Sequence, residues 1–196
     1  MNNRLIKISL ILVVVFIFAI SCKTTEFGYD VIDVNGMIYD FTNRPVPNCE
    51  VSLGSRFTCM TDINGRFTLS RIPAGTYIIS GQKAGFETYS EEITIRDRGQ
   101  IIYFRIPSRL QLLNLADEAL TANNLDLAGE MAGRAYLIDN KNAETVLYYA
   151  AVKFRQHEYR NALMILENAQ EAGIRDTYID KFINGLKEIA NENPSE

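Results

Sequence analysis

The sequence TDINGRFTLSRIPAGTY, residues 61–77, contains a turn, a strand, a second turn and the start of another strand. The segment DING is a polar turn, and its Gly65 can take the positive φ that closes a hairpin. Phe67 and Leu69 then alternate with polar residues, which is the pattern of a half-buried strand. Pro73 interrupts this alternation before it resumes at Tyr77. Residues 61–77 therefore predict two consecutive strands of a sheet with one buried face.

Similar strands are expected on both sides of this stretch. About seven short strands separated by regular turn signals indicate an antiparallel β-sandwich over residues 31–106. The strands expected besides those already described are Val31–Tyr39, Cys49–Leu53, Arg56–Thr61, Glu91–Arg96 and Ile101–Ile106. The candidate core residues are Ile38, Val51, Leu53, Phe67, Leu69, Tyr77, Ile79, Phe86, Ile93 and Ile95.

Five short motifs occur in order along this half of the chain. They are GMIYD (36–40), PVPNCEV (45–51), TDINGRF (61–67), IPAGTY (72–77) and KAGF (83–86). Together they resemble the carboxypeptidase regulatory-like domain, a prealbumin-like (transthyretin-like) sandwich. Asn43 stands where the family usually has glycine and Cys49 where it usually has alanine, and both substitutes suit those places. The resemblance implies a non-catalytic folding or interaction module.

The N-terminus has the pattern of an export signal. Arg4 and Lys7 precede an apolar run at residues 8–20, which is shorter than the roughly 20 residues that span a bilayer. The segment AISC that ends at Cys22 resembles the bacterial lipobox, which implies that Cys22 carries lipid such as palmitate and becomes the new N-terminus. There are two alternatives: the signal is cleaved and leaves a free cysteine, or the segment is not cleaved and serves as the anchor. Residues 23–30 are expected to be a tether.

The other two cysteines, Cys49 and Cys59, flank a predicted hairpin. A diagonal separation of about 7–8 Å across such a hairpin is unfavourable for a disulfide, so two small buried thiols are expected. The chain has no Cys-x-x-Cys motif. The sequence therefore predicts no metal site and no cofactor.

After Pro107 the hydrophobic period changes from two to 3.6, which predicts helices over residues 107–192 and leaves 193–196 as a tail. Ser108 and Gln111 form a capping-box start. Small residues repeat at a spacing of 34, as at Ala116 and Ala150. The expected helices are Arg109–Ala122, Asp126–Ile138, Ala143–Arg155 and Tyr159–Ala172, with a last helix from Asp176 to about Asn191.

This half resembles two tetratricopeptide repeats followed by a capping helix, although the tryptophan and proline positions of that family hold other residues. The resemblance implies that the first helix of each repeat lines a concave, mostly apolar groove for a peptide. An alternative is that these residues pack against the sandwich or the last helix. The predicted groove residues are Leu113, Asp117, Leu120, Leu147, Ala151 and Phe154.

Charge and residue usage exclude several functions. The sandwich half has a net charge of −1 and the helical half −5, which argues against nucleic acid as a partner. His157 is the only histidine and is expected in an exposed turn, so no conventional triad is present. Asp62 lacks the further ligands of a calcium loop, which favours a structural turn. Glu91 and Glu92 are adjacent on a strand and face opposite sides. The sequence predicts a protein that is not an enzyme.

These observations predict a protein of the bacterial cell envelope, attached to a membrane through lipid on Cys22, that acts as a non-catalytic interaction or scaffold module for a protein partner. A second reading is carbohydrate or cell-wall binding by the sandwich, for which Tyr39, Phe57 and Tyr89 are candidates. A third is an uncharacterised hydrolase. The sequence leaves the partner, the membrane leaflet and the oligomeric state open.

Overall fold

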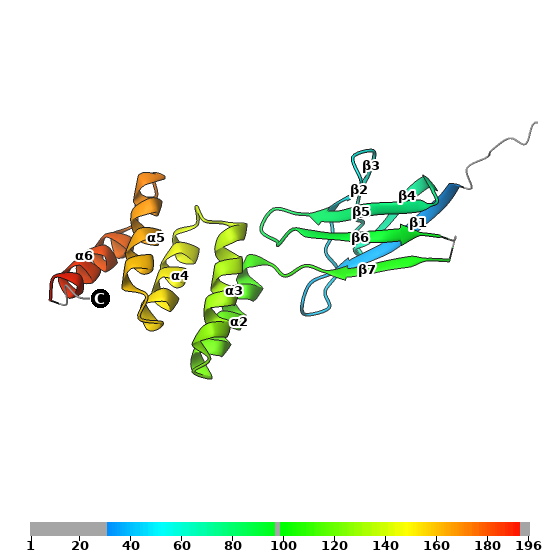
Figure 1. Ribbon diagram of the computed structural model, residues 1–196. Coiled ribbons are helices and arrows are strands. Elements are labelled where there is room, and N and C mark those ends of the chain that lie inside the picture. Colours follow the sequence, from blue (N-terminus) through cyan, green and yellow to red (C-terminus); the bar gives the residue numbers. More distant parts are fainter. Residues whose placement is uncertain (1–30, 97–98, 193–196) are drawn as a thin grey trace, which may run out of the picture.

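The computed structural model describes residues 31–96 and 99–192, and it shows a β-sandwich followed by helices, as predicted (Figure 1). One sheet has the strand order β4-β1-β7 and the other has the order β3-β2-β5-β6. The strands are β1 (Val31–Tyr39), β2 (Glu50–Leu53), β3 (Phe57–Met60), β4 (Arg66–Pro73), β5 (Gly75–Gln82), β6 (Tyr89–Ile95) and β7 (Ile101–Arg105).

Every strand pair is antiparallel except that of β1 with β7, which is parallel, so the sandwich is not purely antiparallel as the sequence predicted. Hydrophobic alternation does not distinguish the two directions, because both leave every second side chain on the same face. The DING turn is structural, as expected. The Asp62 carboxylate accepts the backbone N–H groups of Asn64 and Arg66, each at 2.8 Å, and Gly65 has φ 72°.

Two aromatic rings fill the middle of the sandwich, and each lies over a glycine. A Cβ atom at Gly36 would stand 2.2 Å from the ring of Phe67, and one at Gly81 would stand 2.6 Å from the ring of Phe104. Phe104 also stacks on Tyr89, with ring centroids 4.3 Å apart. Strands β1 and β5 therefore need glycine at these positions, since any side chain would occupy the space of a ring.

The core agrees with the sequence prediction for most residues. Tyr77, Phe86 and Ile93 are half-buried at its margin, whereas the other predicted residues are buried. Cys49 is fully buried, Cys59 is half-buried, and both are free thiols, as expected. Burial raises the pKa of Cys49 to about 11, so that the thiol stays protonated at neutral pH. The buried residues that the sequence prediction omitted are Ile32, Val34, Val46, Ile72, Ile102, Phe104 and Ile106.

The helices follow the predicted bounds to within one or two residues. The predicted capping box is present: Gln111 N–H donates to the Ser108 hydroxyl at 3.2 Å, and Ser108 N–H donates to the Gln111 side chain at 3.0 Å. Asn124 and Asn142 cap the next two helices. The helices are α2 (Arg109–Thr121), α3 (Leu125–Ile138), α4 (Ala143–Arg155), α5 (Tyr159–Glu171) and α6 (Thr177–Glu192).

Consecutive helices pack against one another, and α4 also contacts α2 and α6, so the helices form a row that extends from one end of the sandwich (Figure 1). The alanines that repeat at a spacing of 34 lie at these contacts and are buried. Their small side chains let helix backbones approach closely. They are Ala116, Ala128, Ala135, Ala150, Ala162 and Ala169.

The sandwich and the helices are joined by more than the connecting peptide. Glu87 N–H donates to the carbonyl of Pro107, and Arg109 N–H donates to the carbonyl of Gly85, both at 2.9 Å. The turn that follows β5 is thereby held against the first residues of α2. Because both bonds satisfy backbone groups near the helix start, the orientation of α2 is fixed by the sandwich.

A side-chain pair reinforces this junction from α3. The Arg134 guanidinium donates to both oxygens of Glu87, at 2.8 and 2.7 Å, in the bidentate geometry that favours arginine and carboxylate. The Phe41 ring lies 6.0 Å from the same guanidinium. The hydrogen bond to Glu87 raises the pKa of Arg134 further above its already high value. The pair and the backbone bonds hold the sandwich against α2 and α3.

The close contact at Gly36 gives a first prediction. Gly36→Ala should lower the free energy of unfolding by about 1–3 kcal/mol, because the added methyl overlaps the Phe67 ring and lies 2.6 Å from a backbone oxygen of Ile102. Gly185→Ala is the control, since nothing lies within 4 Å of its added methyl. In the middle of α6 it should raise stability by roughly 0.5–1 kcal/mol. Denaturant melts that place the two variants in the opposite order would contradict this packing.

The junction gives a second prediction. Arg134→Ala should let the sandwich and the helices reorient, because it removes the only bidentate ion pair that joins them in the described residues. In a chain that starts at Lys23, ¹⁵N relaxation should give one rotational correlation time for the wild type and two for the variant.

Glu130→Ala is the matched control, because Glu130 pairs with the same arginine at 3.7 Å, but within α3 and not across the junction. It should keep a single correlation time. An Arg134→Ala variant that also tumbles as one body would show that the backbone bonds alone hold the junction.

Candidate functional site

The six predicted groove residues lie on α2 and α4, but they differ in accessibility. Leu113 is 4% exposed and belongs to the core between α2 and α3, so its side chain is not at the surface. Leu120 and Leu147 are half-buried, and Asp117 and Ala151 are exposed. The accessible part of this face is smaller than the sequence predicted. Its remaining residues, Asp117, Leu120, Leu147, Ala151 and Phe154, are called the α2–α4 face below.

A polar contact joins the two helices on this face. The Tyr148 hydroxyl donates to Asp117 Oδ1 at 3.1 Å. Burial and the neighbouring carboxylate raise the pKa of Tyr148 to about 12, so the hydroxyl remains a donor over the physiological range. Tyr148 was not among the predicted residues. Its place three residues before Ala151, on the same face of α4, is the signal that could have identified it.

The far end of the face is partly covered by the last helix. The Phe154 ring meets Phe182 of α6 edge-on, with centroids 6.0 Å apart, and it also contacts Tyr159 at 5.4 Å. Phe154 is half-buried as a result. It therefore contributes to packing between α4 and α6 as well as to the surface.

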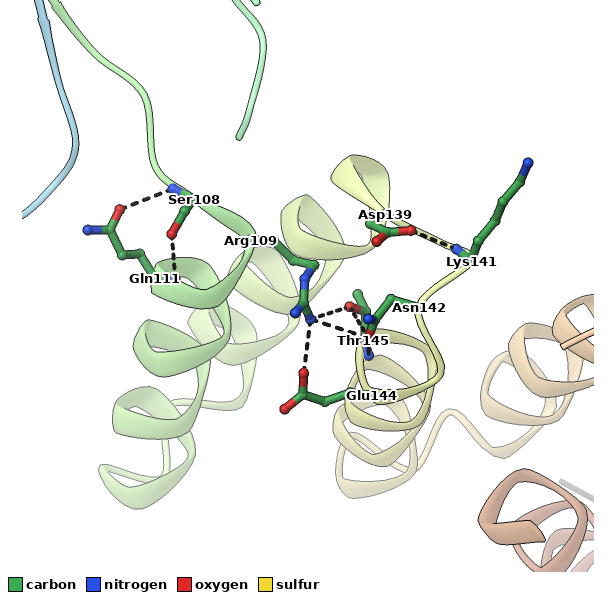
Figure 2. A network of polar contacts seen from close by, with 8 residues as sticks. All are labelled: Ser108, Arg109, Gln111, Asp139, Lys141, Asn142, Glu144 and Thr145. Carbon is green, nitrogen blue, oxygen red and sulfur yellow. Dashed lines mark hydrogen bonds and ion pairs between the residues drawn. The ribbon is translucent and has the colours of Figure 1, made fainter. Parts of the chain in front are cut away.

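Arg109 connects the sandwich to the first turn of α4 (Figure 2). Its guanidinium donates to the Thr145 hydroxyl at 2.8 Å and pairs with Glu144 at 3.1 Å. The same nitrogen lies 3.4 Å from the side chain of Asn142, which caps α4. Since the backbone N–H of Arg109 donates to Gly85, this one residue contacts the sandwich, α2 and α4. The start of the α2–α4 face is thus held in place by the junction.

The aromatic residues proposed for carbohydrate binding do not share a surface, which corrects that part of the sequence analysis. Tyr89 stacks on Phe104 in the core, and Phe57 packs edge-on against Tyr77, at 6.4 Å, in the four-stranded sheet. Of these three residues, only Tyr39 lies on the outer face of the three-stranded sheet. Alternation predicts which side chains of a strand are buried and which face outward, but it does not predict which sheet the strand joins.

Tyr103 is the aromatic residue beside Tyr39 that the sequence analysis missed. It is 61% exposed on β7, which pairs with β1. Tyr39 and Tyr103 line a hollow of about 640 Å³ with Asn43, Phe104 and Arg105. This size lies within the range of about 300–1,000 Å³ that ligand pockets have.

Arg105 borders a second hollow, of about 490 Å³, where the sandwich meets α2. The other residues that line this second hollow are Phe41, Thr42, Gln111, Asn114, Leu115 and Glu118. Gln111 reaches across it, since its side-chain amide donates to the Thr42 hydroxyl at 3.2 Å.

The remaining predicted features form no further site in the described part of the chain. His157 lies in the exposed turn between α4 and α5, as expected, with its Nδ1 2.8 Å from the Tyr159 hydroxyl. Residues 31–96 and 99–192 contain no group of three or more metal-ligating side chains. No helix within these ranges has the length and apolar content needed to cross a membrane. Cys22 and the export signal lie outside the described residues.

Comparisons with solved structures give only distant likenesses. A type II Cohesin–X-Dockerin complex from Acetivibrio cellulolyticus is 21% identical over 39% of this chain and 58% of that chain, with a TM-score of 0.34. A candidate carbohydrate-binding protein from Bacteroides uniformis is 15% identical over 40% and 42% of the two chains, with a TM-score of 0.34. The major pilin subunit of Bacillus cereus is 18% identical over 40% and 30%, with a TM-score of 0.32. This chain thus spans about half or less of their lengths.

No curated protein matches the sequence. A family model does match, over residues 33–102, which are most of the sandwich. The matched region holds β1 from Asp33 onward, β2 to β6 and the first two residues of β7, including both glycines that lie under the aromatic rings. Residues 33–102 of this chain are therefore a carboxypeptidase regulatory-like domain.

Proposed function

We propose that this chain is a lipid-anchored protein of the bacterial envelope whose helices bind a protein partner without catalysing a reaction. The N-terminal charge pattern, the apolar run and the lipobox-like AISC support the anchor at Cys22. In this proposal, lipid holds the chain on a membrane, since each buried methylene contributes about 0.8 kcal/mol.

The observation that carries the proposal is the fixed junction at the helical end of the sandwich. Strand β1 begins at the opposite end, at Val31, while its last residue, Tyr39, accepts a hydrogen bond from Ile106 N–H beside the helices (Figure 1). A chain that is anchored before Val31 would therefore present its helices away from the membrane. A rigid spacer between anchor and binding surface is what a scaffold requires.

In this proposal, α2 to α5 are two tetratricopeptide-like repeats and α6 is their cap. The spacing of 34, the buried alanines at the helix contacts and the contacts of α4 with both α2 and α6 support the assignment. The α2–α4 face then corresponds to the concave side of the repeats. Its half-buried leucines and exposed Ala151 suit the apolar side of a partner helix or peptide.

The anchor is tested by Cys22→Ala. This variant should either appear in the soluble fraction or accumulate as the uncleaved precursor, because the acceptor of the lipid is lost. Metabolic labelling with a palmitate analogue should mark the wild type and leave the variant unlabelled. A variant that is processed, labelled and fractionated like the wild type would rule out lipidation at Cys22.

The binding face is tested at Ala151, because Phe154 also packs against α6 and its loss would mix binding with stability. Ala151→Arg should change the melting temperature little, since surface substitutions usually stay within about 0.5 kcal/mol. It should abolish contact with the partner. A photo-reactive residue at position 151 should form a covalent adduct with the partner in intact cells. A photo-reactive residue at position 147 should also form an adduct, and Ala151→Arg in the same chain should reduce the yield of that adduct.

Asn168→Arg is the control, because Asn168 is exposed on α5, outside the α2–α4 face, and receives the same side chain. Asn168→Arg should leave the yield of the adduct from position 147 unchanged. Equal loss of the adduct in both variants would show that the α2–α4 face is not the binding surface.

A second candidate function is carbohydrate binding by the sandwich. The hollow between Tyr39 and Tyr103 favours it, because aromatic faces beside hydrogen-bonding groups suit sugar rings. No comparable observation in the described residues favours the hydrolase reading.

A further inference from the structure

The geometry points to a binding site for acidic sugars on the outer face of the three-stranded sheet, centred on Arg105. The inference rests on the second candidate function and specifies its ligand class. It does not depend on what the helices bind.

Strand register brings the site together. Tyr39 lies opposite Arg105 in the parallel pair of β1 and β7, and Met37 lies opposite Tyr103. On the other side of β1, Met37 lies opposite Arg66 of β4. All of these side chains are on the outer face, since the residues between them along β1 and β7 are buried. Two arginines therefore flank a strip of Met37 and the two tyrosines.

Both guanidinium groups are without a partner among the described residues. Neither the Arg66 nor the Arg105 side chain makes a hydrogen bond or ion pair with any residue in the ranges that the structure describes. Glu118 borders the second hollow, yet no ion pair joins it to Arg105. By contrast, the guanidiniums of Arg109 and Arg134 are paired with carboxylates. The unpaired positive charges favour an anionic ligand.

Two acids of this sheet and of the turn that follows β1 are already engaged with backbone groups. The Asp40 carboxylate accepts backbone N–H groups of Thr42 and Arg44, at 2.8 and 2.9 Å. Burial alone would raise the pKa of Asp40, but these hydrogen bonds outweigh burial and hold the pKa below its ordinary value. Asp33, at the other end of β1, accepts the N–H of Arg71 at 2.9 Å. Neither of these carboxylates pairs with the Arg105 guanidinium, which leaves it available to a ligand carboxylate.

The tyrosines make a sugar a better ligand than an acidic peptide. Tyr103 exposes most of its surface beside Tyr39, whose hydroxyl is directed along the strand to the sulfur of Met37 at 3.5 Å. Aromatic faces held in this way can stack on the C–H face of a sugar ring. Asn43 adds an amide for ring hydroxyls, and the forked guanidinium of Arg105 suits a carboxylate. A uronic acid combines these groups in one ring.

The test uses the full chain in detergent and trimers of galacturonate and guluronate, each compared with its methyl ester, by isothermal titration calorimetry. At least one acid trimer should bind, its ester should bind more weakly, and added salt should weaken binding of the acid. Arg105→Gln should reduce affinity for the acid about tenfold, as expected for a hydrogen bond to a charged group. Tyr103→Ala should weaken both acid and ester, because it removes the stacking surface.

Arg56→Gln is the control, because Arg56 is also an exposed arginine and lies before β3 on the other sheet. It should bind like the wild type, and all variants should keep the wild-type circular dichroism. The acidic-sugar assignment fails if the esters bind as well as the acids, although carbohydrate binding would then survive. It also fails if Arg105→Gln has no effect, if neither acid trimer binds, or if poly-L-glutamate competes as well as the trimers.

Discussion

The contact of the Arg134 guanidinium with Glu87 and the two backbone bonds beside it determine how the whole molecule is organised. Sandwich and helices could each bury a core alone, and the connection between them is only a few residues long. Without fixed contacts the helices would take many orientations. The bidentate pair removes that freedom because its planar fork must match both carboxylate oxygens at once. The position of the α2–α4 face relative to the start of β1 follows from it.

Each half solves a packing problem in its own way. In the sandwich, the absence of a side chain at Gly36 and Gly81 leaves room for the rings of Phe67 and Phe104 between the sheets. In the helices, alanines at a regular spacing let backbones approach, and larger residues fill the gaps between pairs. Both solutions use small residues where two elements come close. The resulting cores are separate, which leaves the junction to polar groups.

The two candidate surfaces differ in chemistry. The α2–α4 face is mostly apolar and carries one internal polar contact, between Tyr148 and Asp117, which suits a protein partner. The outer face of the three-stranded sheet has the exposed Tyr103, the half-buried Tyr39 and arginines without an ion pair among the described residues, which suits an anionic ring. The rigid junction means that a ligand on one surface and a partner on the other would be held at a fixed separation. Such an arrangement is what a scaffold between a glycan and a protein would require.

The sequence by itself determined the elements. Alternation with period two and turn residues such as Gly65 predicted the strands, and the change of period after Pro107 predicted the helices and the Ser108 cap. These features depend on neighbours in the chain. Tertiary structure alone decided that β7 joins β1 in parallel and brings Arg105 beside Tyr39, because strand partners are chosen by the packing of the whole sheet. It also decided that Leu113 is buried and that α6 covers Phe154, since helix periodicity gives a face but not what lies against it.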